Sequence, residues 1–114
     1  MPLPLLLQSP TRAQLLGFLM WVSINRPAYV LAADINAGQQ IAADVCSQCH
    51  GIRRPSALGL FPSLAGRDKR RIADALRQYR SKQRLSPIMN NLTGSLSHKD
   101  INNIAAYYAW VEPQ

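Results

Sequence analysis

Both cysteines of the chain and one of its two histidines fall in a single pentapeptide, Cys46-Ser47-Gln48-Cys49-His50. Two thiols about one helical turn apart, followed at once by an imidazole, form the attachment signature of c-type haem. In that chemistry the thiols add across the two vinyl groups of one porphyrin, and the imidazole reaches the iron from the same side. We therefore expect Cys46 and Cys49 to hold one covalent haem, with His50 as an axial ligand of its iron.

Other uses of a CxxC pair fit this chain less well. A structural zinc site needs two further ligands, and beyond the motif the chain offers only His98. A dithiol redox centre of the thioredoxin kind needs a βαβ setting, for which the sequence has no signal. A disulfide across two intervening residues is strained and closes almost no loop, so it would add little stability.

The second axial ligand has few candidates. Outside the N-terminal segment the only methionine is Met89, 39 residues beyond His50, on a segment flanked by Pro87 and Asn90 that we expect to be a loop rather than core. His98 is the rival, although its place in the first turn of a helix is typical of a solvated side chain. His/Met ligation raises the reduction potential relative to stronger donors. Two protein ligands also close the iron to substrates, which favours electron transfer over oxygen or peroxide chemistry.

The first third of the chain differs from the rest. An apolar run from Leu15 to Val22 follows Arg12, and Val30-Leu31-Ala32 resembles a small-residue cleavage site, so residues 1–32 are predicted to be a signal peptide and residues 33–114 a haem domain. The run is short of the roughly 20 residues that span a bilayer. An uncleaved anchor is the alternative, and only then would the protein contact a membrane. Export to the periplasm agrees with haem c, which is assembled outside the cytoplasm.

Charge and size constrain the domain further. The chain has 13 basic and 6 acidic residues, and removal of Arg12 and Arg26 leaves 11 and 6, a net charge of +5. About 80 residues bury little core, and such small domains usually depend on a covalent or metal staple. We expect the haem to be that staple.

Helical periodicity recurs in three segments, and no segment alternates as a strand. The expected fold is therefore all-α, with three main helices and irregular loops wrapped around the haem. The predicted helices are 35–46, with Asp34 or Asn36 as N-cap; 68–83, with Asp68 as N-cap; and one that begins at Ser97, has Asp100 as capping-box partner and ends before Pro113. The stretches 51–66 and 85–96 carry Gly and Pro and are predicted to be loops.

The ordered set of motifs resembles a known family, the small class I cytochromes c of bacteria, and most closely one half of the periplasmic dihaem cytochromes c. The resemblance covers about residues 35–111, nearly the whole predicted domain. The motifs that carry it are CSQCHG at 46–51, FPSLAG at 61–66, QYRSKQR at 78–84, SPIM at 86–89 and LSHKDINNIAAYYA at 96–109. A second haem motif is absent from this sequence, so the resemblance implies one haem.

The resemblance implies roles for matching positions. Pro62 is expected to accept a hydrogen bond from the axial imidazole through its carbonyl, a contact that orients the ring. Leu64 and Tyr79 are expected to pack beside the haem, and Gly38 to lie where the first helix crosses the last. The chain departs from the family pattern at Lys82, where a glycine is common; at His98, where an acidic residue is common; and at 52–55, where an Asp-Gly loop is common.

Basic residues gather beside the apolar stripe of the helix predicted at 68–83. They are either solvated surface or a docking patch for an acidic redox partner, and an exported haem domain would rarely meet nucleic acid. The residues in this arc are Lys69, Arg70, Arg77, Arg80 and Arg84.

The residues are compatible with three functions. The first is a freely diffusing electron carrier with no catalytic activity, whose iron cycles between Fe(III) and Fe(II). The second is the haem subunit of an exported dehydrogenase. The third is a peroxidase in which Met89 releases the iron.

Overall fold

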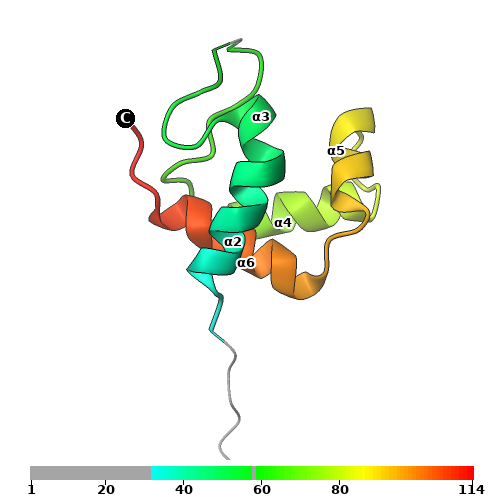
Figure 1. Cartoon of the computed structure of the whole chain (residues 1–114). Helices are drawn as coiled ribbons and strands as arrows, with labels where there is room; N and C mark the ends of the chain where they lie inside the picture. The colour runs from blue at the N-terminus through cyan, green and yellow to red at the C-terminus, as the bar shows by residue number, and fades with distance from the viewer. Residues whose placement is uncertain (1–31, 58) are drawn as a thin grey trace, which may run out of the picture. The chain divides into compact units, whose positions relative to one another are not determined.

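The computed structural model of this chain describes residues 32–57 and 59–114. The predicted signal peptide occupies residues that lie outside this range, apart from Ala32, so it stays a prediction. Within the described part, no helix combines the length and the apolar character needed to cross a bilayer. Residues 32–114 form one compact unit, and every regular element described in it is helical (Figure 1). The all-α prediction is confirmed.

One helical run leads into the CxxCH motif. It consists of α2 (Ile35–Ile41), the π-helix η2 (Ala42–Cys46) and α3 (Ser47–His50), so it extends four residues beyond the predicted end. Asp34 caps it by accepting hydrogen bonds from the backbone N–H groups of Asn36 and Ala37. Single π turns inside α-helices are often found at functional sites. Here the π-helix ends at Cys46, the first residue of the CxxCH motif.

Glycine ends this run and also permits its packing. Gly51 has a φ of 69°, and a Cβ there would overlap the Arg54 carbonyl oxygen, so the chain turns sharply directly after His50. Gly38 lies where α2 crosses α6 (His98–Trp110), and a Cβ at this position would overlap the carbonyl of Asn103. The two backbones can therefore approach only because residue 38 has no side chain.

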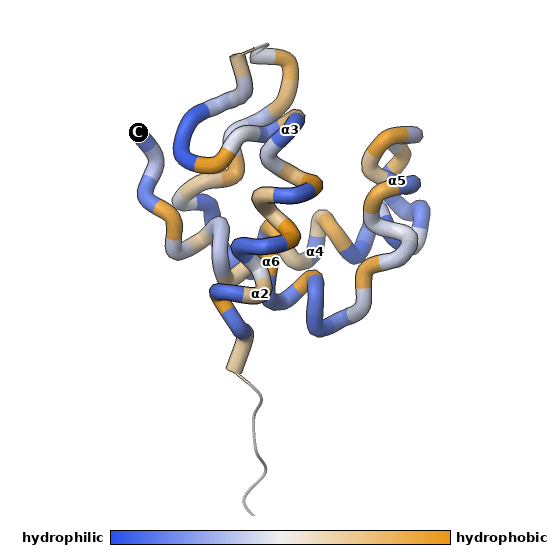
Figure 2. The backbone as a smooth tube through the Cα atoms, viewed as in Figure 1, coloured by the Kyte–Doolittle hydropathy of each residue, from blue (hydrophilic) through white to orange (hydrophobic). Residues whose placement is uncertain are grey.

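The longer helices form as their caps predict. α4 spans Lys69–Arg80 and is capped by Asp68, whose carboxylate accepts from the Arg71 N–H at 2.9 Å. It ends before the predicted residue 83, because Lys82 takes a left-handed conformation with a φ of 62°. α6 begins at the predicted capping box, in which Ser97 and Asp100 satisfy each other's backbone N–H groups. Figure 2 shows hydrophobic and hydrophilic residues alternating along these helices, as expected of helices with one buried face.

The prediction of a loop over 85–96 is wrong, because residues Pro87–Thr93 form the helix α5. Pro87 occupies the first turn of α5, where the missing N–H of proline costs nothing and its fixed φ suits a helix. Ser86 is the N-cap, and its hydroxyl accepts from the Met89 N–H at 3.3 Å. Helix initiation, and not loop stiffening, is the role of this proline.

The core is centred on α6, which packs against α2 and α4, while α5 packs against α4. Ile101, Ile104 and Tyr108 are essentially buried on α6, and Ile72 and Leu76 face them from α4. Figure 1 shows α3 and α5 standing apart, with α4 lying below both. Residues of all three helices line the crevice described below.

Candidate functional site

The two thiols of the motif lie at the end of the first helical run. Cys46 and Cys49 are both partly buried, and neither is in a disulfide. Burial raises the pKa of the Cys46 thiol to about 11, so the free thiol stays protonated at neutral pH and is a poor nucleophile. This environment differs from that of dithiol redox centres, whose cysteines have lowered pKa values.

His50 is oriented by the loop that follows it. Its Nδ1–H donates a hydrogen bond to the Pro62 carbonyl oxygen at 2.7 Å, since a carbonyl can only accept. The imidazole therefore carries its proton on Nδ1, and the lone pair of Nε2 is available to a metal. The ring centroid of Phe61 lies 5.9 Å away, at an angle of 57°, and limits ring rotation from another side.

A hydrogen bond from a core residue fixes the turn after His50. Tyr108, which is fully buried on α6, donates from its phenol to the Gly51 carbonyl oxygen at 3.2 Å. Burial is the main cause that raises the pKa of Tyr108, so the phenol keeps the proton it donates at physiological pH. The segment that presents His50 is thus tied to α6, which holds the largest number of buried residues among the described helices.

A crevice of about 1030 Å³ opens between these elements and matches a porphyrin in its lining. Drug-sized ligands occupy pockets of about 300–1,000 Å³, so the volume suits a large flat group. The wall contains the two thiols and His50 at one end and Met89 at the other, with mostly apolar side chains between them. Those apolar residues include Leu64, Ile72, Leu76, Tyr79 and Ile104.

Met89 reaches the crevice from α5. Its side chain is partly buried, and its backbone carbonyl accepts from the Thr93 hydroxyl at 2.7 Å. The rival residue, His98, is exposed, lies within 3.4 Å of the Arg80 guanidinium and is not among the residues that line the crevice. The structure thus brings Met89, and not His98, to the same crevice as His50.

The predicted site residues therefore converge on one crevice. Cys46, Cys49, His50 and Met89 line it together with Pro62, Leu64 and Tyr79. The residues suit a covalent haem, because they offer two thiols for attachment, a free imidazole nitrogen and a thioether in one largely apolar space. A zinc site is not supported, because the described residues include no group of three His, Cys, Asp or Glu side chains placed to bind a metal ion.

The five basic residues predicted to share a flank are divided by the structure. At about 100° per residue Ala73 lies between Arg77 and Arg80 around α4, and it is only 5% exposed because the core covers this side. Arg77 donates to Asn102 on α6 at 2.8 Å, and Arg80 donates to the Leu96 carbonyl at 2.9 Å.

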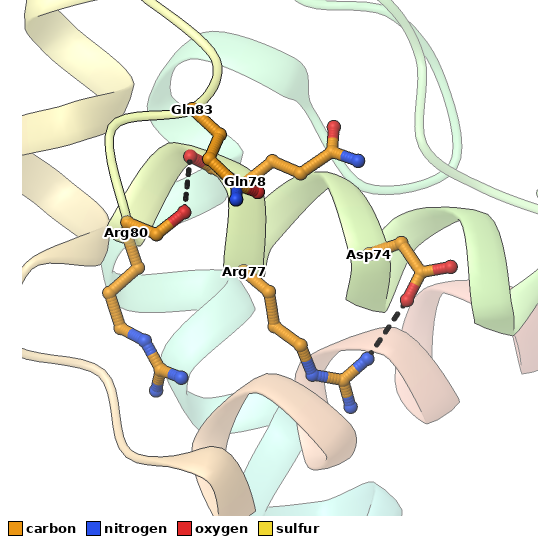
Figure 3. Close-up of a pocket in the computed structure, with 6 residues that line it drawn as sticks. Asp74, Arg77, Gln78, Arg80 and Gln83 are labelled. Atoms are coloured by element: carbon orange, nitrogen blue, oxygen red, sulfur yellow. Dashed lines mark hydrogen bonds and ion pairs between the residues drawn. The ribbon is translucent and has the colours of Figure 1, made fainter.

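The remaining cations of the five are more open. Lys69 and Arg70 are exposed on the first turn of α4. Arg84, also exposed, stacks its guanidinium 5.0 Å from the centre of the Tyr79 ring, at the crevice. A smaller hollow of about 380 Å³ lies along α4, where Arg77 pairs with Asp74 (Figure 3). Neither of the two thiols nor His50 lines that hollow, although Asp74 and Gln78 line both it and the crevice.

Sequence reasoning missed two parts of the site. Arg71 lines the crevice from the side of α4 opposite the predicted basic arc, and Asn90 joins the segments around Met89. The Ser86-Pro87 pair was the available signal for the second part, because Ser at the N-cap with Pro after it is a common helix start.

Comparison with known proteins agrees with this geometry. The family model described as cytochrome C oxidase, cbb3-type, subunit III matches residues 33–107. Cytochrome c4 of Pseudomonas aeruginosa is 38% identical over 78 residues, which cover 68% of this chain and 38% of that protein. Cytochrome c-554(548) of Halomonas halodenitrificans is 31% identical over 81 residues, which cover 68% of this chain and 96% of that protein.

A solved structure shares the fold. The cytochrome c4 of Acidithiobacillus ferrooxidans matches with a TM-score of 0.61 and 22% identity, over 90% of this chain and 66% of the other. The chain thus spans well under half of the Pseudomonas cytochrome c4 but almost all of cytochrome c-554(548). On this evidence the chain belongs to the cytochrome c family, with the class I all-α fold and covalent haem c as its cofactor.

Proposed function

We propose that this protein is a periplasmic electron carrier whose single haem iron is bound by His50 on one side and Met89 on the other. One observation carries the proposal: His50, whose Nδ1 is engaged by Pro62, and Met89 line the same largely apolar crevice, on α3 and α5, two helices that stand apart (Figure 1). Haem c supplies an iron that accepts and releases one electron. No other reaction is required of the site.

The protein's own contribution is to fix both ligands and to exclude water. The Pro62 carbonyl holds the His50 ring in one tautomer and makes it a better donor. The thioether of Met89 favours the reduced iron and so raises the potential. Leu64, Ile72 and Leu76 line the crevice with apolar side chains. In such a low-dielectric environment, a change of one charge on the cofactor has a large electrostatic energy.

The axial assignment is tested by the spectrum of the purified holoprotein. We expect low-spin haem that stays attached under denaturing conditions and a weak near-infrared Fe–S(Met) band in the oxidised state. Met89→Ala should abolish the band, whereas His98→Ala should leave it unchanged. Survival of the band in Met89→Ala would show that another residue binds the iron.

The basic side chains that are exposed to solvent indicate where a redox partner would dock. Lys69 and Arg70 are exposed, whereas Arg77 and Arg80 are engaged with α6 and the segment before it. An acidic partner would therefore meet the N-terminal turn of α4 and the exposed Arg84 at the crevice, where complementary charge mainly accelerates encounter. Electron-transfer rates should fall with salt, and Lys69→Glu with Arg70→Glu should weaken that salt dependence. Rates that do not change with ionic strength would contradict this docking surface.

A further inference from the structure

We propose that Asn90 is a positioning residue that keeps Met89 at the iron, an inference that rests on the ligand assignment above. Its side-chain amide makes three hydrogen bonds to three different backbone segments. Nδ2 donates to the Tyr79 carbonyl at 2.7 Å and to the Arg84 carbonyl at 2.8 Å, and Oδ1 accepts from the Ser86 N–H at 2.9 Å. One side chain thus joins the end of α4, the following turn and the start of α5.

Every polar atom of this amide is used, and in the only orientation that fits. Carbonyl oxygens can only accept, so the NH₂ group must face Tyr79 and Arg84, and the oxygen must face the Ser86 N–H. Tyr79 lies in the last turn of α4, where carbonyls have no partner within the helix. The Tyr79 carbonyl also accepts from the Lys82 N–H at 3.1 Å. Removing the partly buried Asn90 side chain therefore costs the Tyr79 and Arg84 carbonyls one hydrogen bond each and leaves the Ser86 N–H without its partner.

The segment that carries Met89 has few other attachments. α5 is seven residues long and packs on α4 alone among the larger helix contacts. Its apolar residues Ile88 and Leu92, 53% and 38% exposed, line the crevice that the haem would fill. Isolated helices of this length are unstable. Apart from the haem, α5 is held by the packing of Met89 and of the buried Thr93 and by polar contacts, of which Asn90 provides side-chain hydrogen bonds that reach outside the helix.

The functional consequence concerns which ligands can reach the iron. While Asn90 holds α5 against α4, Met89 competes effectively with outside ligands for its axial position. When that hold is weakened, the fraction of molecules with Met89 displaced increases, and the apparent affinity for an added ligand increases in proportion. Asn90 thus helps to keep this protein an electron carrier with a closed iron.

The test uses oxidised holoprotein titrated with imidazole, followed by loss of the near-infrared Fe–S(Met) band. Asn90→Ala should bind imidazole about tenfold more tightly or more, the effect expected when buried backbone groups lose their partners. Asn90→Asp keeps the acceptor for Ser86 but loses both donors, and it should shift in the same direction. If Asn90→Ala does not fold, Asn90→Asp decides the question.

Asn102→Ala is the matched control, because it removes an amide that accepts from Arg77 and links α4 to α6 away from Met89. It should lower the unfolding midpoint while leaving imidazole affinity unchanged. Imidazole affinity equal to wild type in Asn90→Ala, or equally raised in Asn102→Ala, would overturn the proposal. A wrong assignment of Met89 as the iron ligand would give a different result. In that case the Fe–S(Met) band would survive in Met89→Ala.

Discussion

The two ends of the haem crevice are supported by different kinds of interaction. His50 is held by a turn that the buried Tyr108 ties to α6, and the helix that leads to it crosses α6 in van der Waals contact at Gly38. Met89 lies on a short helix whose apolar residues Ile88 and Leu92 line the crevice, and hydrogen bonds of Asn90 and Ser86 join this helix to the chain before it. The first support is part of the core, and the second is polar and local. Disturbance of the core should therefore affect the whole fold, whereas disturbance of α5 should affect the iron.

The largest effect is expected from breaking the core support. Gly38→Ala places a Cβ within overlap distance of the Asn103 carbonyl, so α2 and α6 must separate. We expect a loss of at least about 3 kcal/mol in the free energy of unfolding, measured by urea titration of the holoprotein. Gly94→Ala is the control, because a Cβ there would lie 3.5 Å from its nearest neighbours and the backbone is already right-handed. Equal midpoints for the two variants would contradict a close crossing at Gly38.

The difference in stability between the two ends of the crevice can be measured by amide hydrogen exchange. Elements with few buried contacts open at lower free energy than core helices. We expect the slowest amides of α5 to exchange at least about tenfold faster than those of α6, a difference of about 1.4 kcal/mol in opening free energy. Equal protection of the amides of α5 and α6 would show that the Met89 end of the crevice opens at the same free energy as the His50 end.

A smaller effect is expected at the capping box that starts α6. Hydrogen bonds from the Ser97 hydroxyl and the Ser97 N–H lower the pKa of Asp100. The ionised carboxylate therefore stabilises the fold above the ordinary pKa of about 3.9, and this contribution is lost as pH falls through the lower folded pKa. Since the carboxyl group is largely solvated, Asp100→Asn should cost less than about 1 kcal/mol at neutral pH.

The pH dependence distinguishes this effect from a general loss of helix stability. The difference in thermal midpoint between wild type and Asp100→Asn should shrink as the pH is lowered through the range in which Asp100 titrates. A difference that stays constant down to acid pH would mean that the charge of Asp100 contributes nothing.

The smallest effect is expected in the turn that enters the Met89 end. Lys82 has a φ of 62°, a left-handed conformation that costs an L-residue about 1–2 kcal/mol. Lys82→Gly removes this strain but adds about 0.5–1 kcal/mol of unfolded-state entropy. A gain of up to about 1 kcal/mol should follow in thermal or urea unfolding, with no change in the Fe–S(Met) band. A loss of stability would mean that the lysine side chain makes a favourable contact in this turn.

Much of the site was predictable from residue types. CxxCH specifies its chemistry through spacing, so Cys46, Cys49 and His50 could be assigned without a fold. The Asp68 cap and the Ser97 capping box are local signals and correctly marked the starts of α4 and α6. By contrast, the Pro87 segment was predicted to be a loop because proline has two opposite meanings, breaker within a helix and favoured residue at its start.

The basic arc shows what helical periodicity leaves open. Periodicity places Arg77 and Arg80 on one side of α4, but whether that side faces water depends on where α6 packs. The structure buries Ala73 within the arc and turns both arginines toward α6 and the segment before it. Arg71, on the other side of the same helix, lies at the crevice instead.

The sequence alone determined the cofactor and the helical class and offered His50 as a candidate axial ligand, because these depend on the identity and spacing of residues close together in the chain. The contacts of Pro62 and of Gly38 were expected only from the family resemblance. Only the tertiary structure decided which further distant groups meet: Tyr108 at the Gly51 carbonyl, Arg77 at Asn102, and Asn90 between the end of α4 and the start of α5. Such contacts depend on how helices cross and where loops return, and these are properties of the packed chain as a whole.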